Sequence, residues 1–214
     1  MVERIAVIAD IHGNMPALEA VLNDIDQRGI KRIMCLGDTI GKGPNPDLAV
    51  DKVRQSCESV CMGNWEAGII WPLEGISPCF GKIIEWNRRK LGTERLEYLA
   101  QTPFCLDLML SGKLVRLFHS SAKGIHHRVH PVNPIEERLA MFENTAYTGK
   151  APVDKEPDVV GYADIHSAYI QNFEGKTLFN TGSVGNPLDI AQSSYVILED
   201  RKSTRLNSSH GIIS

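Results

Sequence analysis

The sequence predicts a mixed α/β (α+β) fold in which buried strands alternate with helices. Two apolar runs, residues 4–9 and 31–36, are rich in Ile, Val, Ala and Leu and have the composition of strands buried on both faces. Between them, residues 15–27 carry apolar side chains at helical spacing, and Gly29 follows as a stop signal. A helix joining two such strands forms a right-handed βαβ unit, so both strands should end at the same edge of a parallel sheet.

The middle of the chain continues this pattern and then becomes helical. Residues 47–55 predict a short helix, whose start is favoured by Pro46 and Asp47, and residues 59–62 predict a third strand. From Trp65 onward the sequence is aromatic and helically spaced, which predicts helices near 78–91 and 93–101. We interpret residues 66–102, approximately, as a small helical insertion.

The remaining elements are two hairpins, a helix and two further strands. Each hairpin is predicted from two short strands on either side of a turn. The first has strands at 106–110 and 113–118, and the second has strands at 167–173 and 176–180. Residues 134–142 predict a helix, and residues 158–162 and 195–198 predict strands. We assign residues 1–199 to one domain. Residues 200–210 can be back-translated into a common sequencing adapter, so we expect 200–214 to be a non-native tail.

Composition limits the classes of partner. The 214 residues carry a formal net charge of −3 without a long Lys/Arg cluster, which argues against binding to long nucleic acids. The chain lacks an 18-residue apolar span, so we expect no membrane association. Its five cysteines are odd in number and form no CxxC pair, which indicates reduced thiols and a cytoplasmic location.

Polar residues follow the predicted strands at the points where they end. Each alone has a structural explanation: Asp38 could cap a helix, Asn64 could belong to a turn, and His119 could be a hydrogen-bonded core histidine. Together they offer oxygen and nitrogen ligands without a thiolate, which favours two divalent ions over a structural zinc site. Two such ions about 3.5–4 Å apart typically catalyse displacement at phosphorus. The set is Asp10, His12, Asp38, Asn64, His119, Asp164 and His166.

These motifs resemble the calcineurin-like metallophosphoesterase superfamily. The matching segments are Asp10-x-His12, Gly37-Asp38, Gly63-Asn64, His119 and the segment ending in His166, in a superfamily whose pattern is DxH, GD, GN(H/x)(D/E), H and GHxH. The resemblance extends from residue 4 to about 199. Segments 9–14, 37–46 and 179–187 are similar to small prokaryotic members related to dinucleoside polyphosphate hydrolases and phosphodiesterases.

The resemblance implies a four-layer αββα sandwich with two metals at the carboxyl ends of the strands. One metal would bind Asp10, His12 and His166, the other Asn64, His119 and Asp164, and Asp38 would bridge them. Asp10, His12, Asp38, Asn64 and His119 would also be the catalytic residues. A hydroxide shared by the metals would attack phosphorus in line, without a covalent intermediate.

Two positions depart from the superfamily pattern. Where GHxH is usual, the chain reads Ala163-Asp164-Ile165-His166, and the added carboxylate favours Mn²⁺ or Fe²⁺ over softer ions, with Zn²⁺, Ni²⁺ or Co²⁺ as alternatives. Where many members carry a histidine that protonates the leaving oxygen, this chain carries Trp65, whose indole cannot do so.

Further residues are candidates for binding substrate. Asn14, His126, His127 and Arg128 are assigned this role, although the last three could equally form a solvated loop, and Lys42 near the Gly37-Asp38 loop is a candidate of the same standing as those three. We expect hydrolysis of a small phosphodiester, phosphomonoester or nucleotide anhydride, and the chain could form a homo-oligomer. The alternatives are a metal-binding regulatory or scaffolding module with little catalysis, and a nuclease or protein-phosphatase-like activity.

Overall fold

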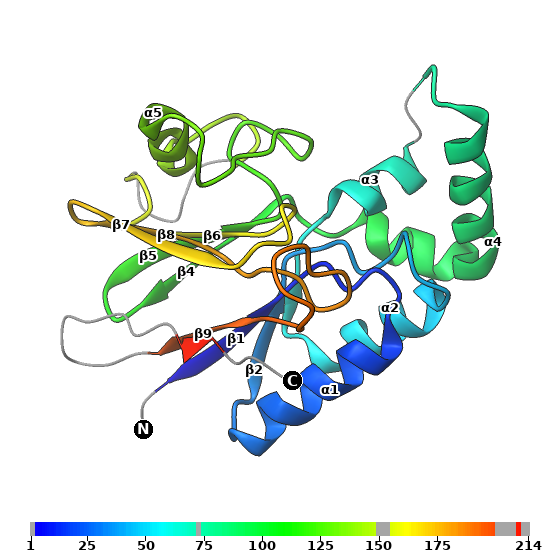
Figure 1. The fold of residues 1–214 in the computed structure, drawn as a ribbon, viewed down its shortest axis with the longest axis horizontal. Helices are drawn as coiled ribbons and strands as arrows, with labels where there is room; N and C mark the ends of the chain where they lie inside the picture. Colours follow the sequence, from blue (N-terminus) through cyan, green and yellow to red (C-terminus); the bar gives the residue numbers. More distant parts are fainter. Residues whose placement is uncertain (1–2, 72–73, 149–154, 200–208, 211–214) are drawn as a thin grey trace.

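The computed structural model describes residues 3–71, 74–148, 155–199 and 209–210, which form two five-stranded sheets (Figure 1). The first sheet has the order β10 (Ser209–His210), β9 (Val196–Glu199), β1 (Arg4–Ile8), β2 (Arg32–Cys35) and β3 (Ser59–Val60). The second has the order β4 (Cys105–Leu110), β5 (Lys113–Phe118), β6 (Val159–Tyr162), β8 (Lys176–Asn180) and β7 (Tyr169–Phe173). The helices are α1 (Met15–Gln27), α2 (Pro46–Ser56), α3 (Asn64–Ile70), α4 (Pro78–Ala100), α5 (Ile135–Leu139) and the 3₁₀ helix η1 (Ala140–Phe142).

Three hydrophobic clusters separate four layers. Side chains of β1 alternate between two of them: Ala6 and Ile8 pack toward α1 and α2, whereas Ile5 and Val7 pack against the second sheet. A third cluster joins the second sheet to η1. Figure 1 shows α1 and α2 covering one outer face and α5 the other. The αββα arrangement is confirmed, and β1 is buried on both faces as predicted.

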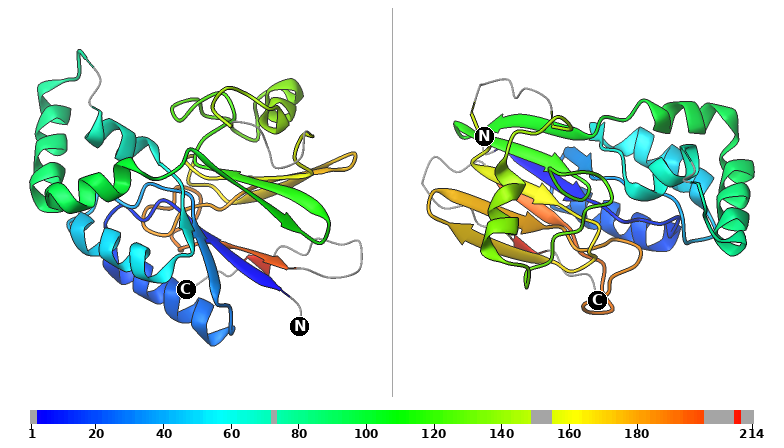
Figure 2. Two further views of the ribbon diagram at one scale, coloured as in Figure 1. Left: turned by 180° about the vertical axis from the view of Figure 1, so that it is seen from behind. Right: turned by 90° about the horizontal axis from the view of Figure 1, so that it is seen from above.

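Parallel pairing brings the strand ends to one edge of each sheet. Strands β1, β2 and β3 are parallel neighbours in the first sheet, as are β5, β6 and β8 in the second. The predicted βαβ unit is therefore confirmed. Both views in Figure 2 show α3 and α4 at one end of the sandwich. They pack there around a separate cluster that includes Ile69, Ile84 and Leu91.

Most predicted elements are present with small shifts at their ends. Helix α1 has the predicted bounds. The two helices predicted on either side of residue 92 are the two parts of α4, which is kinked at Gly92. Gly92 has φ 68° and ψ 174°, a conformation that glycine can adopt because it lacks a Cβ. The helix predicted at 134–142 is a shorter α-helix followed by a 3₁₀ turn, and the third strand ends at Val60 instead of residue 62.

Three further sequence predictions concern the tail, the cysteines and membrane-spanning helices. The predicted tail mostly lies outside the described residues, although Ser209 and His210 pair with β9; the division into domain and tail stays a prediction. All five cysteines are free thiols, as predicted. Within the described ranges, helices long and apolar enough to cross a bilayer are absent.

Candidate metal centre

Five of the predicted ligands have a left-handed backbone. Asp10, His12, Asp38, Asp164 and His166 have φ between 51° and 64°, a region that costs non-glycine residues energy and is concentrated at functional sites. In the described part of the chain, Ser111 is the only other non-glycine residue with positive φ. Conformations that are locally unfavourable are thus gathered at one place, where the surrounding structure maintains them.

Strand geometry does not account for the proximity of Asp10 and His12. Their spacing of two residues would direct both side chains to one side of a strand, but β1 ends at Ile8 and both residues are left-handed. The backbone is held instead by hydrogen bonds from the N–H of Asp10 to the carbonyl of Gly37 at 3.1 Å and from the N–H of His12 to the carbonyl of Asp38 at 2.9 Å. The loops after β1 and β2 therefore fix each other.

We call Asp10, His12 and His166 the first half of the centre. Potential ligand atoms of these residues and of Asp38 all lie within 4.8 Å of one another, and all four residues are buried. Nδ1 of His12 faces the carbonyl of Ile40 and therefore carries the proton, because a carbonyl only accepts. Nδ1 of His166 faces both the carbonyl of Asn186 and, at 3.0 Å, the side-chain nitrogen of the same residue. The Nε2 atoms of His12 and His166 face each other at 3.2 Å. Two lone pairs at that distance repel unless a proton or a metal ion lies between them.

An unpaired carboxylate oxygen completes this half. Oδ1 of Asp10 is buried without a hydrogen-bond partner and lies 3.2 Å from Nε2 of His166. An unpaired buried oxygen of this kind costs free energy unless a cation or another donor reaches it. Carbonyl-oriented imidazoles beside an unpaired carboxylate oxygen are the arrangement that a divalent ion requires.

We call Asn64, His119 and Asp164 the second half. His119 donates from Nδ1 to the carbonyl of Leu36 at 2.7 Å, which leaves its Nε2 as the atom that can bind a metal ion in exchange for a proton. That Nε2 is buried without a hydrogen-bond partner, 3.4 Å from Oδ1 of Asp38 and 3.8 Å from Oδ1 of Asp164. His119 is therefore oriented as a ligand too, toward a different position from His12.

Asp38 lies between the two halves. Its Oδ2 is 3.8 Å from Nε2 of His12, and its Oδ1 is 3.4 Å from Nε2 of His119. Oδ1 also accepts a hydrogen bond from the backbone N–H of Trp65 at 2.9 Å. One oxygen thus faces each half, which is the geometry that a bridging carboxylate needs.

Asp164 already has a cationic partner. Arg128 contacts both of its oxygens from Nε, at 3.1 and 3.0 Å, and Oδ1 from a terminal nitrogen at 3.0 Å. The amide nitrogen of Asn64 donates to Oδ1 at 2.7 Å, and the hydroxyl of Ser120 donates to Oδ2 at 2.8 Å. The carboxylate that stands where the superfamily has histidine is consequently neutralised by the protein itself.

The pKa shifts of the histidines differ between the halves. Burial lowers the pKa of His12 and keeps its imidazole neutral. Burial also opposes protonation of His166 and His119, but the adjacent carboxylate of Asp10 raises the pKa of His166, and attraction to Asp38 raises that of His119 to about 10. Burial opposes ionisation of Asp38, but His119 and His12 outweigh it and lower its pKa. A metal ion would compete with these protons.

Glu66 is a buried supporting residue that the sequence analysis did not assign. Its carboxylate accepts hydrogen bonds from the backbone N–H groups of Asp38 and Thr39, both at 2.8 Å, and of Gly63 at 3.1 Å. Burial, followed by repulsion from Asp38, raises its pKa to about 7. Its position two residues after Asn64, where the superfamily pattern has Asp or Glu, was the available signal. Glu66 joins the loops that carry Asp38 and Asn64.

Glycine is required where those two loops touch. Gly37 has φ 87°, and a Cβ there would lie 2.5 Å from the backbone nitrogen of Gly63. A Cβ on Gly63 would lie 2.2 Å from the backbone nitrogen of Asp38. Both distances are too short for any side chain, so the glycines before Asp38 and Asn64 allow the direct backbone packing that sets the spacing of the centre.

The predicted substrate-binding residues have different surroundings. The side chain of Asn14 caps α1 at Ala17 and donates to the carbonyl of Gly185 at 2.9 Å, so both ends of its amide have backbone partners. His127 lies 3.1 Å from the hydroxyl of Ser121 through Nδ1. His126 and Arg128 line a cavity of about 290 Å³ next to Asn64. Binding of substrate by any of the four stays a prediction.

Trp65 packs against the helical region. Its ring is 5.5 Å from that of Phe80 in α4 and 6.0 Å, edge to face, from that of His12. A Cβ on Gly41 would lie 2.4 Å from the indole, so the ring rests directly on that backbone. Whether another residue supplies the proton that Trp65 cannot donate to the leaving oxygen stays a prediction.

Comparisons with known proteins agree with this geometry. A model of the calcineurin-like phosphoesterase superfamily domain matches residues 4–203. An uncharacterised protein of Methanocaldococcus jannaschii is 33% identical over 202 residues, covering 92% of this chain and 83% of that protein. A metallophosphoesterase from Sphaerobacter thermophilus has a TM-score of 0.79 at 22% identity, covering 100% of this chain and 89% of that one. A phosphoesterase from E. coli has a TM-score of 0.53 at 20% identity, covering 91% and 87%.

Proposed function

Because the chain belongs to the calcineurin-like phosphoesterase superfamily, we propose that it is a metal-dependent hydrolase of a small phosphodiester, phosphomonoester or nucleotide anhydride. The observation that carries this proposal is the set of buried ligand atoms that converge on Asp38 and Asp10. Nε2 of His12 and Nε2 of His119 face opposite oxygens of Asp38, and Oδ1 of Asp10 has no partner. Such a set is costly without cations and suited to holding them.

We assign one divalent ion to each half. Asp10, His12 and His166 would hold the first, Asn64, His119 and Asp164 the second, and Asp38 would contact both. When bound, the ions would lower the pKa of water and neutralise charge at phosphorus. The hard carboxylate and amide oxygens support Mn²⁺ or Fe²⁺, with Zn²⁺, Ni²⁺ and Co²⁺ as alternatives.

Two cationic side chains are available for the phosphate. Arg128 contacts Asp164, and 57% of its side chain is exposed, so it can reach a ligand outside the centre. Burial lowers the pKa of Lys42, while attraction to Asp10 and Asp38 opposes that change. Both residues would orient the phosphate and balance its charge.

A turnover screen tests the function. Purified protein with added Mn²⁺ should hydrolyse at least one member of a panel of aryl phosphates, cyclic nucleotides and dinucleoside polyphosphates. A chelator should abolish turnover, and Asp38→Asn should be inactive under the same conditions. Turnover that survives both the chelator and the substitution would come from a contaminant or from another site, and would contradict the proposal.

One observation favours a second candidate, a metal-binding regulatory or scaffolding module. Trp65 cannot supply a proton, and Arg128 balances Asp164 without a metal. This candidate predicts that the protein binds two ions and yet turns over none of the aryl phosphates, whose leaving groups need no acid. We favour the hydrolase because the other ligand atoms keep their orientation.

A further inference from the structure

The cavity beside the second half of the centre is walled by aromatic and aliphatic side chains. It has a volume of about 290 Å³ and lies between α3, α4 and the loop that follows β5. Trp65, Ile69, Ile76 and Phe80 form its apolar wall. Ligand pockets for drug-sized molecules start at about 300 Å³, so this space suits a single small group.

The polar end of the cavity adjoins the metal centre. Asn64 and Arg128 line it, and both donate hydrogen bonds to Asp164. Trp65 lies edge to face with the ring of His12, and its backbone N–H binds Asp38. A phosphoryl group held at the centre would therefore direct its organic substituent toward the apolar wall.

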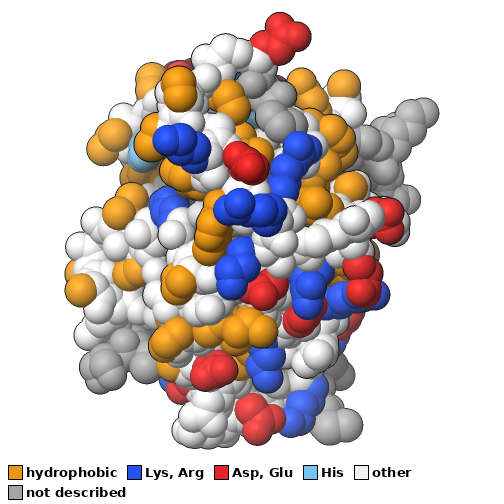
Figure 3. All heavy atoms as spheres, turned by 90° about the vertical axis from the view of Figure 1, so that its right-hand side faces the viewer, with side chains coloured by type: hydrophobic (Ala, Val, Ile, Leu, Met, Phe, Trp, Pro, Cys, Tyr) orange, Lys and Arg blue, Asp and Glu red, His pale blue; other side chains and the backbone are white. Residues whose placement is uncertain are grey.

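The wall itself indicates the shape of that substituent. Trp65 and Phe80 are tilted by 53° with their ring centres 5.5 Å apart. Phe80 is 37% exposed, so part of its surface is free to contact a ligand. Aromatic side chains prefer flat π systems that stack or meet them edge to face. Figure 3 shows hydrophobic side chains among basic and acidic ones on the side that carries α4.

We infer that this cavity binds a flat aromatic group, an aryl ring or a nucleobase, attached to the phosphoryl group of the substrate. The inference rests on the proposed function and narrows its substrate class. Trp65, at the position where many relatives have a histidine, thus has a binding role in addition to its packing on Gly41. The aromatic ring would lie on the Trp65–Phe80 wall, with Arg128 at the phosphate.

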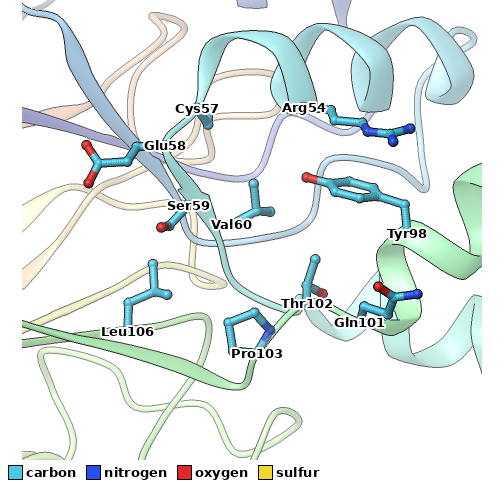
Figure 4. Close-up of a pocket in the computed structure, with 10 residues that line it drawn as sticks. All are labelled: Arg54, Cys57, Glu58, Ser59, Val60, Tyr98, Gln101, Thr102, Pro103 and Leu106. Atoms are coloured by element: carbon cyan, nitrogen blue, oxygen red, sulfur yellow. The ribbon is translucent and has the colours of Figure 1, made fainter. Parts of the chain in front are cut away.

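A larger cavity elsewhere does not support a similar inference. It has a volume of about 400 Å³ and lies among α2, β3, the end of α4 and the start of β4 (Figure 4). Its arginine, Arg54, is already paired with Glu94 at 2.9 Å and lies over the ring of Tyr98. None of the predicted site residues line this cavity.

Phosphonates test the inference without turnover, because their C–P bond is not hydrolysed by an esterase. Calorimetric titration of the Mn²⁺-loaded protein should show phenylphosphonate binding at least threefold more tightly than cyclohexylphosphonate, as expected for an aromatic pair. Apolar burial alone would give the reverse order, because cyclohexyl carries more apolar hydrogen-bearing surface. Methylphosphonate measures binding at the phosphoryl site alone.

Variants assign the effect to the cavity. Phe80→Leu should remove the preference for phenyl over cyclohexyl, while Ile83→Ala, at a similarly exposed residue of the same helix, should keep it. Equal binding of the phenyl and cyclohexyl ligands, or a preference that survives Phe80→Leu, would overturn the inference and leave the proposed function intact. Failure of all three phosphonates to bind the loaded protein would overturn both.

Nucleotides distinguish the two kinds of aromatic group. Stacking of a base on aromatic residues strengthens binding by about five- to 150-fold. If the group is a nucleobase, the protein should therefore bind AMP more tightly than ribose 5-phosphate by that factor. Equal affinity for these two, with the phenyl preference retained, would identify an aryl group. Loss of both preferences would contradict a flat aromatic occupant.

Discussion

The two halves of the metal centre neutralise their carboxylates differently. In the first half, Oδ1 of Asp10 is unpaired and the Nε2 atoms of His12 and His166 face each other. In the second half, Asp164 accepts hydrogen bonds from Arg128, Asn64 and Ser120. The first half is therefore incomplete without a cation, whereas in the second half the carboxylate is satisfied and Nε2 of His119 is the one fully buried polar atom without a hydrogen-bond partner. A carboxylate in place of a histidine is accompanied here by its own counter-ion, so we expect the first half to bind metal more tightly.

Asp38→Asn should have the largest effect because it removes the residue that the halves share. An amide cannot offer two anionic oxygens to two cations. We expect metal content to fall in both halves and activity to fall by more than the roughly 10–100-fold that loss of an outer-shell partner costs. Elemental analysis after gel filtration measures the metal. A variant that retained two ions at wild-type affinity would exclude the bridging role.

The absence of an acid at position 65 should produce the next largest effect. General acids typically contribute about 10²–10⁴-fold, so without one the rate should fall steeply as the leaving alcohol becomes more basic. A series of substituted phenyl esters measures this slope, with preference expected for p-nitrophenyl esters and phosphoanhydrides over alkyl phosphates. A nearly flat series that becomes steep when His126 or His127 is replaced would instead identify that histidine as the acid.

The fold could be predicted because its signals are local. The continuous apolar run of residues 4–9 and the helical spacing of 15–27 recur in the structure with nearly the same ends. The order of polar residues at the strand ends also predicted which side chains would meet. Patterns with periods of two or 3.6 residues survive in any packing that buries the apolar face.

The remaining features of the site depend on residues distant in sequence. The left-handed φ of Asp10 and His12 follows from backbone bonds to the loop after β2, which no local pattern specifies. Arg128 reaches Asp164 across 36 positions, and Glu66 reaches the backbone of Asp38 across 28. Such partners are set by tertiary packing, so the sequence placed Arg128 only among substrate-binding candidates and left Glu66 unassigned.

Asp164→Ala, measured beside Asp10→Ala, separates the halves directly. Asp164→Ala should lose one ion and most activity while retaining the ion of the first half. Asp10→Ala should lose the more tightly bound ion, because its unpaired oxygen has no substitute nearby. Titration with Mn²⁺ gives the number and affinity of sites. Unchanged metal content in Asp164→Ala would mean that Asp164 serves only as the structural partner of Arg128.

Arg128→Met should strengthen metal binding in the second half. Hydrogen bonds to charged groups contribute about 1.5–3 kcal/mol, and partial exposure reduces that value, so we expect roughly a tenfold gain in affinity at this site. Arg128→Lys is the matched control, because it keeps the charge but not the two-point contact with Asp164. Its affinity for the metal ion of the second half should lie closer to that of the wild type. An unchanged second-half affinity in Arg128→Met would show that the ion pair does not compete with metal.

Glu66→Gln should have the smallest effect on the centre and should act on the second half more than the first. At pH 8, above the pKa of about 7 that burial gives Glu66, the carboxylate is ionised and accepts from the N–H groups of Asp38, Thr39 and Gly63. Glutamine replaces one acceptor oxygen with an NH₂ group, so at least one buried N–H loses its partner, at a cost of about 1–3 kcal/mol in unfolding free energy. Because these N–H groups belong to the loops of Asp38 and Asn64, the second-half ion should weaken further than the first. Exposed Glu97→Gln is the control for denaturant unfolding and Mn²⁺ titration. Equal weakening of both ions would show that Glu66 supports the centre as a whole, and the difference between the halves would then arise from Arg128 alone.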